Sequence, residues 1–545
     1  MYRSNKHPEH SSLIKIGFIS SKALALGIMS VTGPVSLVDV GILLFSLLFS
    51  YGLYVRGQRA RQALPPGPKG WPLIGNIFDI PKHAQWLAYA NWAREYGSPL
   101  IHVKMLGTHI VIANDMATAR EILDKKASNF NLRPRLAMLN EAVGFGWCFA
   151  FTPNLGLWSK CRPLFQKHFR QAESRKWRPH EKRMASTFLR RLLETPDKFF
   201  EHVPYMAGTL ILDMVYGIEV KPEENEFLHC AHIAEEGADR SGDRNIVDVF
   251  PWIQRFPTWL PGMRWKKQTD EWKLNSLRML NATYEWVQEE ICQGRGRQCL
   301  ATDLLDQFSG DALHSNGNEY AIKSTCATAY SGGADTTVAY FRAFILAMVL
   351  FPNAQQRAHA ELDRVVGGER LPDFSDESSL PYISALVKEV FRWAAVFPLG
   401  LPHVNINDDE WNGYFIPKGT VVMPNVWAIL HDPSTYPEPE KVLPERFLTA
   451  AGQIDASVQG PDAVFGFGKR VCAGRFMAHD SMWYTTACIL SVFDITAKPG
   501  KPLPSAPLFR PGLVLHTMPF ECDIKPRSED AVQLIQRARL ESEPL

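Results

Sequence analysis

One cysteine, Cys472, lies in an unusual setting near the C-terminal end of the chain, in the stretch FGFGKRVCAGR. A structural cysteine normally lies among apolar residues and behaves as a small hydrophobic side chain. Here three glycines and three basic residues surround the thiol, and a helical pattern begins just after it. Because a helix N-terminus and nearby cations favour a thiolate, we expect the pKa of Cys472 to be lowered. A lone thiolate suits a metal that brings its other ligands with it, as haem iron does.

A second motif that could do chemistry is AYSGGADTTVAYF, in which Asp335 is the only charged residue. The apolar surroundings predict a buried helix, where a carboxylate is costly unless it is paired or useful. Gly332 and Gly333 would allow a flat cofactor to approach the backbone. Asp335 and Thr336 offer an acid and a hydroxyl side by side, which suits the relay of protons. The alternative is a glycine-kinked core helix in which Asp335 is satisfied by hydrogen bonds.

These two motifs carry a resemblance to a known family. Five positions of the cysteine loop match the haem-binding signature FxxGxRxCxG of the cytochrome P-450 superfamily: Phe465, Gly468, Arg470, Cys472 and Gly474. The motif with Asp335 and Thr336 is similar to the oxygen-activation motif of the same family. The likeness covers about residues 65–527 and is greatest to eukaryotic microsomal haem-thiolate monooxygenases, especially fungal members of secondary metabolism.

The resemblance implies further residues that hold the haem propionates, whose negative charges need nearby donors. Trp158 and Arg162 have the i, i+4 spacing of one helical face and match the family's WxxxR pattern. His403 matches a position after an extended segment, and Arg470 belongs to the cysteine loop. Pro163 departs from the expected pattern, because it removes a backbone donor inside the same helix.

A structural network and a substrate pocket are also implied. Glu389 and Arg392 in KEVFR stand at i, i+3, where an ion pair forms readily, and PERF adds Arg446 downstream. The resemblance gives these three residues a structural role beneath the haem. Six residues are expected to line an apolar substrate pocket, although each would equally suit a core position: Phe145, Trp147, Tyr330, Val396, Phe397 and Leu513.

The expected activity follows from the family. The resemblance implies a haem b cofactor that activates O2 with electrons from NADPH, delivered by NADPH-cytochrome P-450 reductase, with cytochrome b5 as a further donor. The substrate would be an apolar small molecule, namely a terpenoid, polyketide or aromatic secondary metabolite, which the enzyme hydroxylates. Two alternatives stay open: a haem-thiolate isomerase or peroxygenase that needs no reductase, and a non-enzymatic haem carrier or sensor in the membrane.

Basic residues cluster near both ends of the expected haem site. We expect them to form a docking surface for the acidic, flavin-containing reductase, although an ordinary solvated face is the alternative. The cluster consists of Lys160, Arg162, Lys167, His168, Arg170, Lys469 and Arg475.

The composition limits the other classes of protein. The chain has 545 residues, of which 46% are hydrophobic, so a large core can form. Its 59 basic and 57 acidic residues give a net charge of +2 and no reason to expect nucleic-acid binding. The nine cysteines are odd in number and include no CxxC pair, which argues against a disulfide framework or a zinc ribbon.

The elements that must position these residues are expected to form a mainly α fold with a small β region. A strand-like, turn-rich patch at 396–426 contains the turn signals NG and PKG. We expect one catalytic domain behind an N-terminal anchor, with five parts: an N-terminal segment (1–34), a transmembrane helix (35–55), a basic and proline-rich linker (56–76), the haem-thiolate monooxygenase domain (77–527) and a mobile C-terminal tail (528–545).

The anchor prediction rests on length and flanking charge. Residues 35–55 are long enough to span a lipid bilayer of about 30 Å as a helix. Arg56, Arg59 and Arg61 follow directly, so the positive-inside tendency places the catalytic domain in the cytoplasm. A cleaved signal peptide or a buried core helix would be the alternatives. We therefore expect a single-pass protein of the endoplasmic reticulum membrane.

Overall fold

The computed structural model of this protein describes most of the chain. The described residues are 41, 43, 44, 46, 47, 50 and 63–542, except 221–225, 245, 309 and 507. They belong to two compact units, Met1–Ala63 and Leu64–Leu545. In the first unit the described residues between 41 and 50 are helical, and Leu43, Leu44 and Leu47 are exposed. Most of the predicted transmembrane helix at 35–55 lies outside the described residues.

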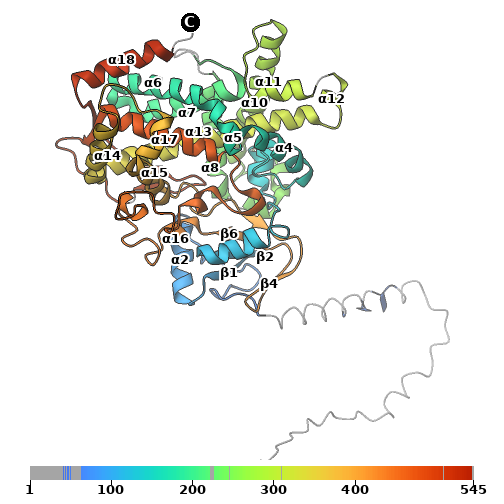
Figure 1. Ribbon diagram of the computed structural model, residues 1–545. Coiled ribbons are helices and arrows are strands. Elements are labelled where there is room, and N and C mark those ends of the chain that lie inside the picture. The colour runs from blue at the N-terminus through green and yellow to red at the C-terminus, as the bar shows by residue number, and fades with distance from the viewer. Residues whose placement is uncertain are drawn as a thin grey trace, which may run out of the picture. The chain divides into compact units, whose positions relative to one another are not determined.

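Helices make up most of the second unit, as expected from the sequence (Figure 1). Among the described residues they are α2 (Gln85–Glu95), α3 (Met116–Ala119), α4 (Leu155–Phe169), α5 (Gln171–Ser174), α6 (Arg178–Glu194), α7 (Phe199–Tyr216), α8 (Glu226–Arg240), α9 (Ile246–Val249), α10 (Trp265–Cys292), α11 (Leu300–Gln307), α12 (Asp311–His314), α13 (Asn318–Leu350), α14 (Pro352–Val365), α15 (Pro381–Ala394), α16 (Val426–Leu430), α17 (Arg475–Val492) and α18 (Glu529–Ser542).

The strands are short and form one four-stranded sheet and three two-stranded pairs within the described residues. The larger sheet has the order β1-β2-β6-β3, in which β2 and β6 are parallel and the other neighbours are antiparallel. Its strands are β1 (Leu100–Met105), β2 (Thr108–Ala113), β3 (His403–Val404) and β6 (Val421–Pro424). The pairs are β4 (Asp409–Trp411) with β5 (Tyr414–Ile416), β7 (Phe493–Ala497) with β10 (Cys522–Pro526), and β8 (Phe509–Arg510) with β9 (His516–Thr517).

The predicted turn-rich β patch is confirmed. The NG signal forms the turn of the β4–β5 hairpin, where Asn412 and Gly413 have φ values of 46° and 80°. Two successive residues with positive φ are typical of the tight hairpin turn that matches the twist of the strands.

Helix α13 runs through the middle of the molecule and joins two hydrophobic cores (Figure 1). Its first half, up to Ala334, packs in a core with α4, α7 and α10, and its second half, from Val338, packs with α15 and α17. Residues 335–337 therefore lie where the two cores meet. The helix ends at Leu350, because Pro352 disfavours helical backbone at the residue before it.

Among the described residues, α13 is also the one helix that is long and apolar enough to cross a membrane. However, 72% of its most apolar window is buried inside the protein. We therefore assign α13 to the core, and its apolar character reflects packing on all sides.

The proline-rich linker is not a free spacer, and the predicted domain start at residue 77 is too late. The carbonyl oxygen of Pro66 accepts a hydrogen bond from the His102 amide at 2.9 Å. Asn76, which is 2% exposed, binds the Lys104 amide through its side chain at 2.9 Å and the Pro68 carbonyl at 3.0 Å. The segment therefore lies along the edge strand β1 as part of the second unit, which begins at Leu64.

The prediction of a mobile C-terminal tail at 528–545 is wrong for the described part. Glu529–Ser542 form α18, which lies beside α6 in Figure 1. Its charged residues suggested a tail, yet Ala531, Leu534 and Ile535 form a buried stripe on one face. Such i, i+3 and i, i+4 spacing is the pattern of a helix that packs on a core.

Candidate functional site

The site is built around the loop that carries Cys472. The amide of Cys472 donates a hydrogen bond to the Phe465 carbonyl at 2.7 Å, which closes the loop just before Gly474 caps α17. Phe465 itself is fixed by an edge contact with Phe391, at 5.3 Å between ring centroids. The Cys472 side chain is exposed, whereas every other cysteine except Cys292 is buried.

The pKa of the Cys472 thiol differs from the prediction. Although its side chain is accessible, protein atoms surround the thiol, and this burial raises its pKa. The Gly474 amide and the charges of Arg162 and Arg475 act in the opposite direction but are weaker. Without a bound metal, the pKa of Cys472 therefore shifts in the direction opposite to the predicted one. A metal that binds the sulfur displaces this proton.

The glycines of the loop have different roles. Gly468 has a φ of 58°, and a Cβ there would overlap the carbonyl oxygen of Leu123. The close neighbour of Gly468 is therefore protein backbone. Near Gly474, by contrast, a Cβ would meet only the Phe165 ring, at 3.9 Å.

Three buried guanidinium groups lie near one another beside this loop, although their positions in the sequence are far apart. Arg162 on α4 is 7% exposed, Arg470 is 8% exposed and Arg133 is 6% exposed. Repulsion from Arg162 adds to burial in lowering the pKa of Arg470 to about 10, and repulsion from Arg470 adds to burial in lowering that of Arg133 to about 9. Within the described residues, no Asp or Glu forms an ion pair with any of them.

Two of these groups leave nitrogen atoms without a partner. Arg470 donates to the carbonyls of Asn131 and Phe149 at 2.9 and 3.1 Å, but its Nη2 is buried without a partner among the described residues. The same is true of Nε of Arg162. The Arg470 guanidinium also lies over the Trp158 ring, 4.5 Å from its centroid.

The sequence motifs predicted His403 as a residue of the haem site, but they did not predict Arg133. Arg133 donates to the carbonyls of Ala150, Leu401 and Pro402, each at 2.9 Å. His403 is 3% exposed, with Nδ1 2.7 Å from the Phe130 carbonyl. Burial, together with Arg133 and Arg470, holds the pKa of His403 well below its usual value, so the ring is neutral. No local motif marks Arg133, because its partners come from distant segments.

The donor set fits a haem. Three buried cations without acidic partners are costly unless an anion joins them, and propionates supply two negative charges. The unpartnered nitrogens of Arg162 and Arg470 supply donors to such an anion. Cys472 supplies the thiolate on the same side of the fold as Arg162, with which it interacts electrostatically.

The motif on α13 divides into two faces. A Cβ at Gly333 would lie 2.7 Å from Cδ1 of Ile211, so this glycine permits close packing against α7. Gly332 is exposed and faces open space, although it lies in the middle of a core helix. Only Gly332 therefore agrees with the expected approach of a cofactor.

The two polar residues of this motif are partly exposed. The Thr336 hydroxyl donates to the Gly332 carbonyl at 2.7 Å. Oδ1 of Asp335 lies 3.2 Å from Nε2 of His516 on β9. The sequence motif therefore predicted the acid and the hydroxyl, but it did not predict the histidine that pairs with the acid.

Glu389, Arg392 and Arg446 come together in one buried network. Nε of Arg392 donates to Glu389 at 2.8 Å, and Nε of Arg446 donates to the same carboxylate at 3.0 Å. Arg392 also reaches the carbonyls of Leu430 and Lys441, both at 3.0 Å. Glu389 and Arg392 are fully buried. Their hydrogen bonds with Leu430, Lys441 and Arg446 tie α15 to the segment before the cysteine loop.

The predicted substrate pocket is only partly supported. Phe145, Trp147 and Tyr330 are at most 2% exposed and belong to the same hydrophobic core. This burial agrees with the alternative of a core position, and their assignment to a pocket wall stays a prediction. Val396 is also a core residue, at 4% exposed. Only Phe397 and Leu513 are half-buried.

Comparison with known proteins identifies the family. The sequence profile of cytochrome P450 matches residues 65–524. The chain belongs to the cytochrome P450 family. A cytochrome P450 monooxygenase of Armillaria gallica is 37% identical, over 88% of this chain and 95% of that protein. Cytochrome P450 monooxygenase 208 of Postia placenta is 37% identical, over 91% and 96%, and tryptamine 4-monooxygenase of Psilocybe cyanescens is 36% identical, over 91% and 99%. The protein is thus an enzyme, a haem-thiolate monooxygenase, as the motifs predicted.

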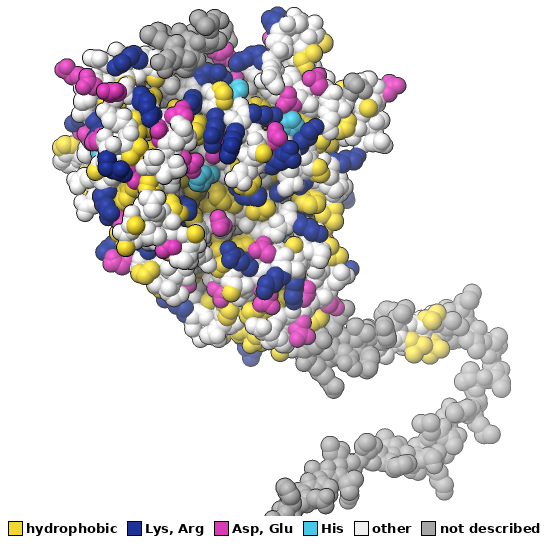
Figure 2. Space-filling model, viewed as in Figure 1, with side chains coloured by type: hydrophobic (Ala, Val, Ile, Leu, Met, Phe, Trp, Pro, Cys, Tyr) yellow, Lys and Arg dark blue, Asp and Glu magenta, His cyan; other side chains and the backbone are white. Residues whose placement is uncertain are grey.

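Only part of the predicted basic cluster lies on the surface of this cytochrome P450. Lys160, Lys167, Arg170 and Lys469 are exposed and Arg475 is half-buried, whereas Arg162 and His168 are buried and cannot contact a partner. Figure 2 shows Lys and Arg side chains gathered on the face that carries α4 and α5. A smaller set than predicted is therefore available for docking.

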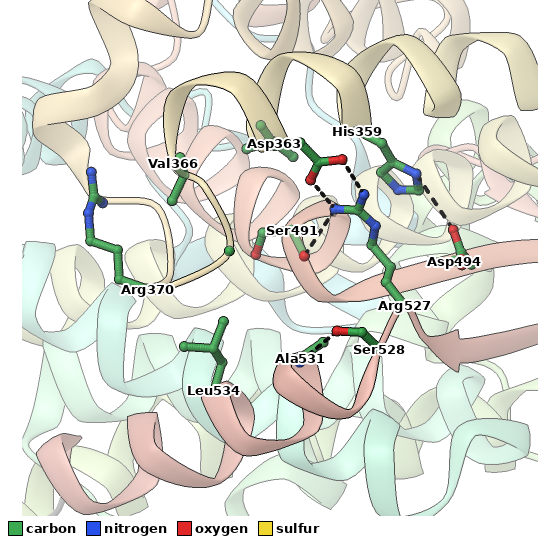
Figure 3. Close-up of a pocket in the computed structure, with 12 residues that line it drawn as sticks. His359, Asp363, Val366, Arg370, Ser491, Asp494, Arg527, Ser528, Ala531 and Leu534 are labelled. Carbon is green, nitrogen blue, oxygen red and sulfur yellow. Dashed lines mark hydrogen bonds and ion pairs between the residues drawn. The ribbon is translucent and has the colours of Figure 1, made fainter.

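A cavity of about 340 Å³ lies elsewhere in this cytochrome P450, between α14 and α18 (Figure 3). Its charged side chains are paired: Arg527 with Asp363 at 2.7 Å, and His359 with Asp494 at 3.5 Å. Because these groups already satisfy one another, the cavity has no free charge for a ligand. It is separate from the Cys472 site.

Proposed function

We propose that this cytochrome P450 uses O2 and electrons from NADPH, delivered by a reductase, to hydroxylate an apolar small molecule. The observation that carries the proposal is the group of buried arginines that have no acidic partner in the described part of the chain, beside the Cys472 loop. This arrangement supports a bound dianionic cofactor with a thiolate ligand.

The proposal assigns each residue a task. Cys472 would bind the iron, and Arg162, Arg470, Arg133 and Trp158 would hold the propionates. When bound, haem b supplies the activation of O2, which a thiolate ligand promotes by favouring O–O cleavage. The protein contributes binding, orientation and electrostatics.

Asp335 and Thr336 are proposed to hold and move protons. The Thr336 hydroxyl lies beside the open space at Gly332, and Asp335 is next to it in the chain. Both side chains are partly exposed in the central part of a mostly buried helix, so protons can reach them. This supports the role of general acid that the sequence motif suggested.

The electron donor is proposed to be NADPH-cytochrome P450 reductase, with cytochrome b5 as a second donor. The exposed residues Lys160, Arg170 and Lys469 support docking of an acidic partner, because complementary charge raises the rate of association. The proposed cellular site is the endoplasmic reticulum membrane, with residues 35–55 as a single-pass anchor and the catalytic unit in the cytoplasm.

The substrate is proposed to be a terpenoid, polyketide or aromatic compound of secondary metabolism. Half-buried Phe397 and Leu513 support an apolar contact surface. One relative is named for its action on tryptamine, which supports the inclusion of aromatic compounds in the first substrate panel.

The first experiment is the absorption spectrum of the reduced protein with carbon monoxide, with Cys472→Ser as control. We expect a strongly red-shifted Soret band in the wild type and its loss in the variant, because a thiolate ligand of the iron would cause the shift. A histidine-type band in fresh wild-type protein would overturn the proposal. Substrate turnover without NADPH would instead support an isomerase or peroxygenase.

A further inference from the structure

Charged side chains from three elements meet beside the oxygen-activation motif. They come from α8, from α13 and from the β8–β9 pair, and they are Glu235, Asp239, Asp335, Arg510 and His516. Arg510 pairs with Asp239 at 3.2 Å, and His516 pairs with Asp335 at 3.2 Å. None of these contacts is local in the sequence.

His516 is the central member of this charged group. It is 7% exposed, and its two ring nitrogens have different surroundings. Nε2 faces the Asp335 carboxylate, whereas Nδ1 is buried without a hydrogen-bond partner among the described residues. An imidazole held in this way can take up a proton and transfer one to the carboxylate.

The β8–β9 pair holds His516 in a fixed position over α13. Arg510 and His516 are register partners in the pair. Asp239 accepts a hydrogen bond from the Leu513 amide at 2.9 Å, which ties the connecting turn to α8. A Cβ at Gly512 would overlap the Asp239 carboxylate, so a larger residue there would displace this side chain. The histidine is thus positioned by contacts on two sides.

Glu235 brings a further acid close to Asp335. Its Oε1 is buried without a partner among the described residues. Burial, together with the negative charge of Asp335, raises the pKa of Glu235 well above its usual value. Burial also raises the pKa of Asp239, although Arg510 opposes this effect.

On α13 itself, Arg342 interacts with Asp335. Burial lowers the pKa of Arg342 to about 10, and the charge of Asp335 acts in the opposite direction. The charge on Asp335 is therefore stabilised by His516 and Arg342 and opposed by the acids of α8.

We propose that His516 is a positioning residue that orients Asp335 and restores its proton during turnover. Protonated His516 gives its Nε2 proton to Oδ1 of Asp335, so that an N–H bond breaks and an O–H bond forms. The imidazole then takes up a proton from solvent, and no electron is transferred in either step. This inference rests on the proposed monooxygenase function, in which Asp335 and Thr336 consume protons.

The test compares His516→Gln with His359→Gln in the full-length, haem-loaded protein. His359 is the control, because its side chain is mostly buried and it also pairs with an aspartate, the half-exposed Asp494, at 3.5 Å (Figure 3). Glutamine can hydrogen-bond the carboxylate but cannot transfer a proton. Both variants remove one histidine–carboxylate pair, so both test the structural contribution of such a pair.

Two kinds of readout separate proton transfer from structure. The first is the thermal unfolding midpoint at pH 6 and pH 8, which we expect to change by similar amounts in both variants. The second is peroxide formed per NADPH consumed, measured with the reductase in the absence of substrate. Only His516→Gln should raise this ratio, by at least twofold, and increase the solvent deuterium isotope effect on NADPH consumption, because water formation needs additional protons.

The outcomes are distinguishable. An unchanged peroxide ratio in His516→Gln, with a normal carbon monoxide spectrum, would overturn the relay alone. Lack of the thiolate spectrum in the wild type would overturn the proposed function itself. If His516→Gln does not bind haem, His516→Asn is measured in the same assays, and an unchanged peroxide ratio in that variant would overturn the relay.

Discussion

Arg162 carries a buried charge that the protein alone does not satisfy. Its Nε has no hydrogen-bond partner among the described residues, and its electrostatic neighbours are Cys472, Arg470 and Arg475. A side chain in this situation lowers the stability of the protein alone. Its presence is explained by a ligand that arrives with negative charge.

The substitution Arg162→Met tests this explanation. We expect faster transfer of haem to apomyoglobin, by tenfold or more, since a hydrogen bond to a charged group contributes about 1.5–3 kcal/mol. The free energy of unfolding of the haem-free protein should stay the same or rise, because an unpaired buried charge is removed. Exposed Arg175 serves as control, and Arg175→Met should change neither quantity. A loss of stability in the haem-free protein would indicate a structural role for Arg162 instead.

Glu181 on α6 gives a prediction about pH. It is 1% exposed, and neither carboxylate oxygen has a hydrogen-bond partner among the described residues. Burial and the nearby charge of Asp480 raise its pKa well above the usual value. The folded protein therefore keeps this proton at a pH at which the unfolded chain has lost it, so stability falls as pH rises above the unfolded pKa of about 4.3.

The substitution Glu181→Gln removes this dependence. The free energies of unfolding of variant and wild type should be similar near pH 4. Above about pH 5 the difference should grow in favour of the variant by about 1.4 kcal/mol per pH unit, until the raised pKa of Glu181 is reached. Chemical denaturation at several pH values measures this, and parallel curves would contradict it.

At the scale of elements, α18 lies beyond the matched family region. The family profile ends at residue 524, and α18 spans Glu529–Ser542. Its start is fixed by Ser528, whose hydroxyl accepts from the Ala531 amide at 3.1 Å, and by the ion pair of Arg527 with Asp363. The helix covers α6 and α17.

The substitution Ile535→Ala tests whether this contact stabilises the fold. Ile535 is 1% exposed, so we expect a loss of about 2–5 kcal/mol in the free energy of unfolding. Gln536→Ala on the exposed face of α18 should change it by less than about 0.5 kcal/mol. Equal, small effects of the two substitutions would mean that α18 does not contribute.

At the scale of the whole molecule, the catalytic unit begins earlier than its sequence motifs suggest. Asn76 and Pro66 bind the edge strand β1 through Lys104 and His102. The proline-rich segment thus closes one side of the larger sheet. A functional truncation must therefore retain it.

Two truncations test this boundary. Removal of residues 1–62 should release the protein from the membrane fraction and leave its thermal midpoint and carbon monoxide spectrum unchanged. Removal of residues 1–76 should lower the midpoint by several degrees, because hydrogen bonds along β1 and buried Asn76 are lost. Equal midpoints for the two truncated proteins would show that the segment adds no stability.

The sequence by itself determined the family, the mainly helical fold and the central motifs. Cys472 with its glycines, the apolar helix around Asp335 and the NG hairpin turn are all local patterns, and local patterns report short-range preferences of the chain. Proline and charge content led to wrong predictions for the linker and for α18, because such content does not show what a segment packs against.

Only the tertiary structure decided which distant residues meet. Arg133 joins Arg470, and His516 joins Asp335, through contacts between segments more than a hundred residues apart. The tertiary structure also shows that Phe145 and Trp147 pack in a hydrophobic core. An apolar residue looks the same in sequence in a core or at a pocket wall. Burial and pairing depend on how complete elements pack, and that packing is set by the whole chain at once.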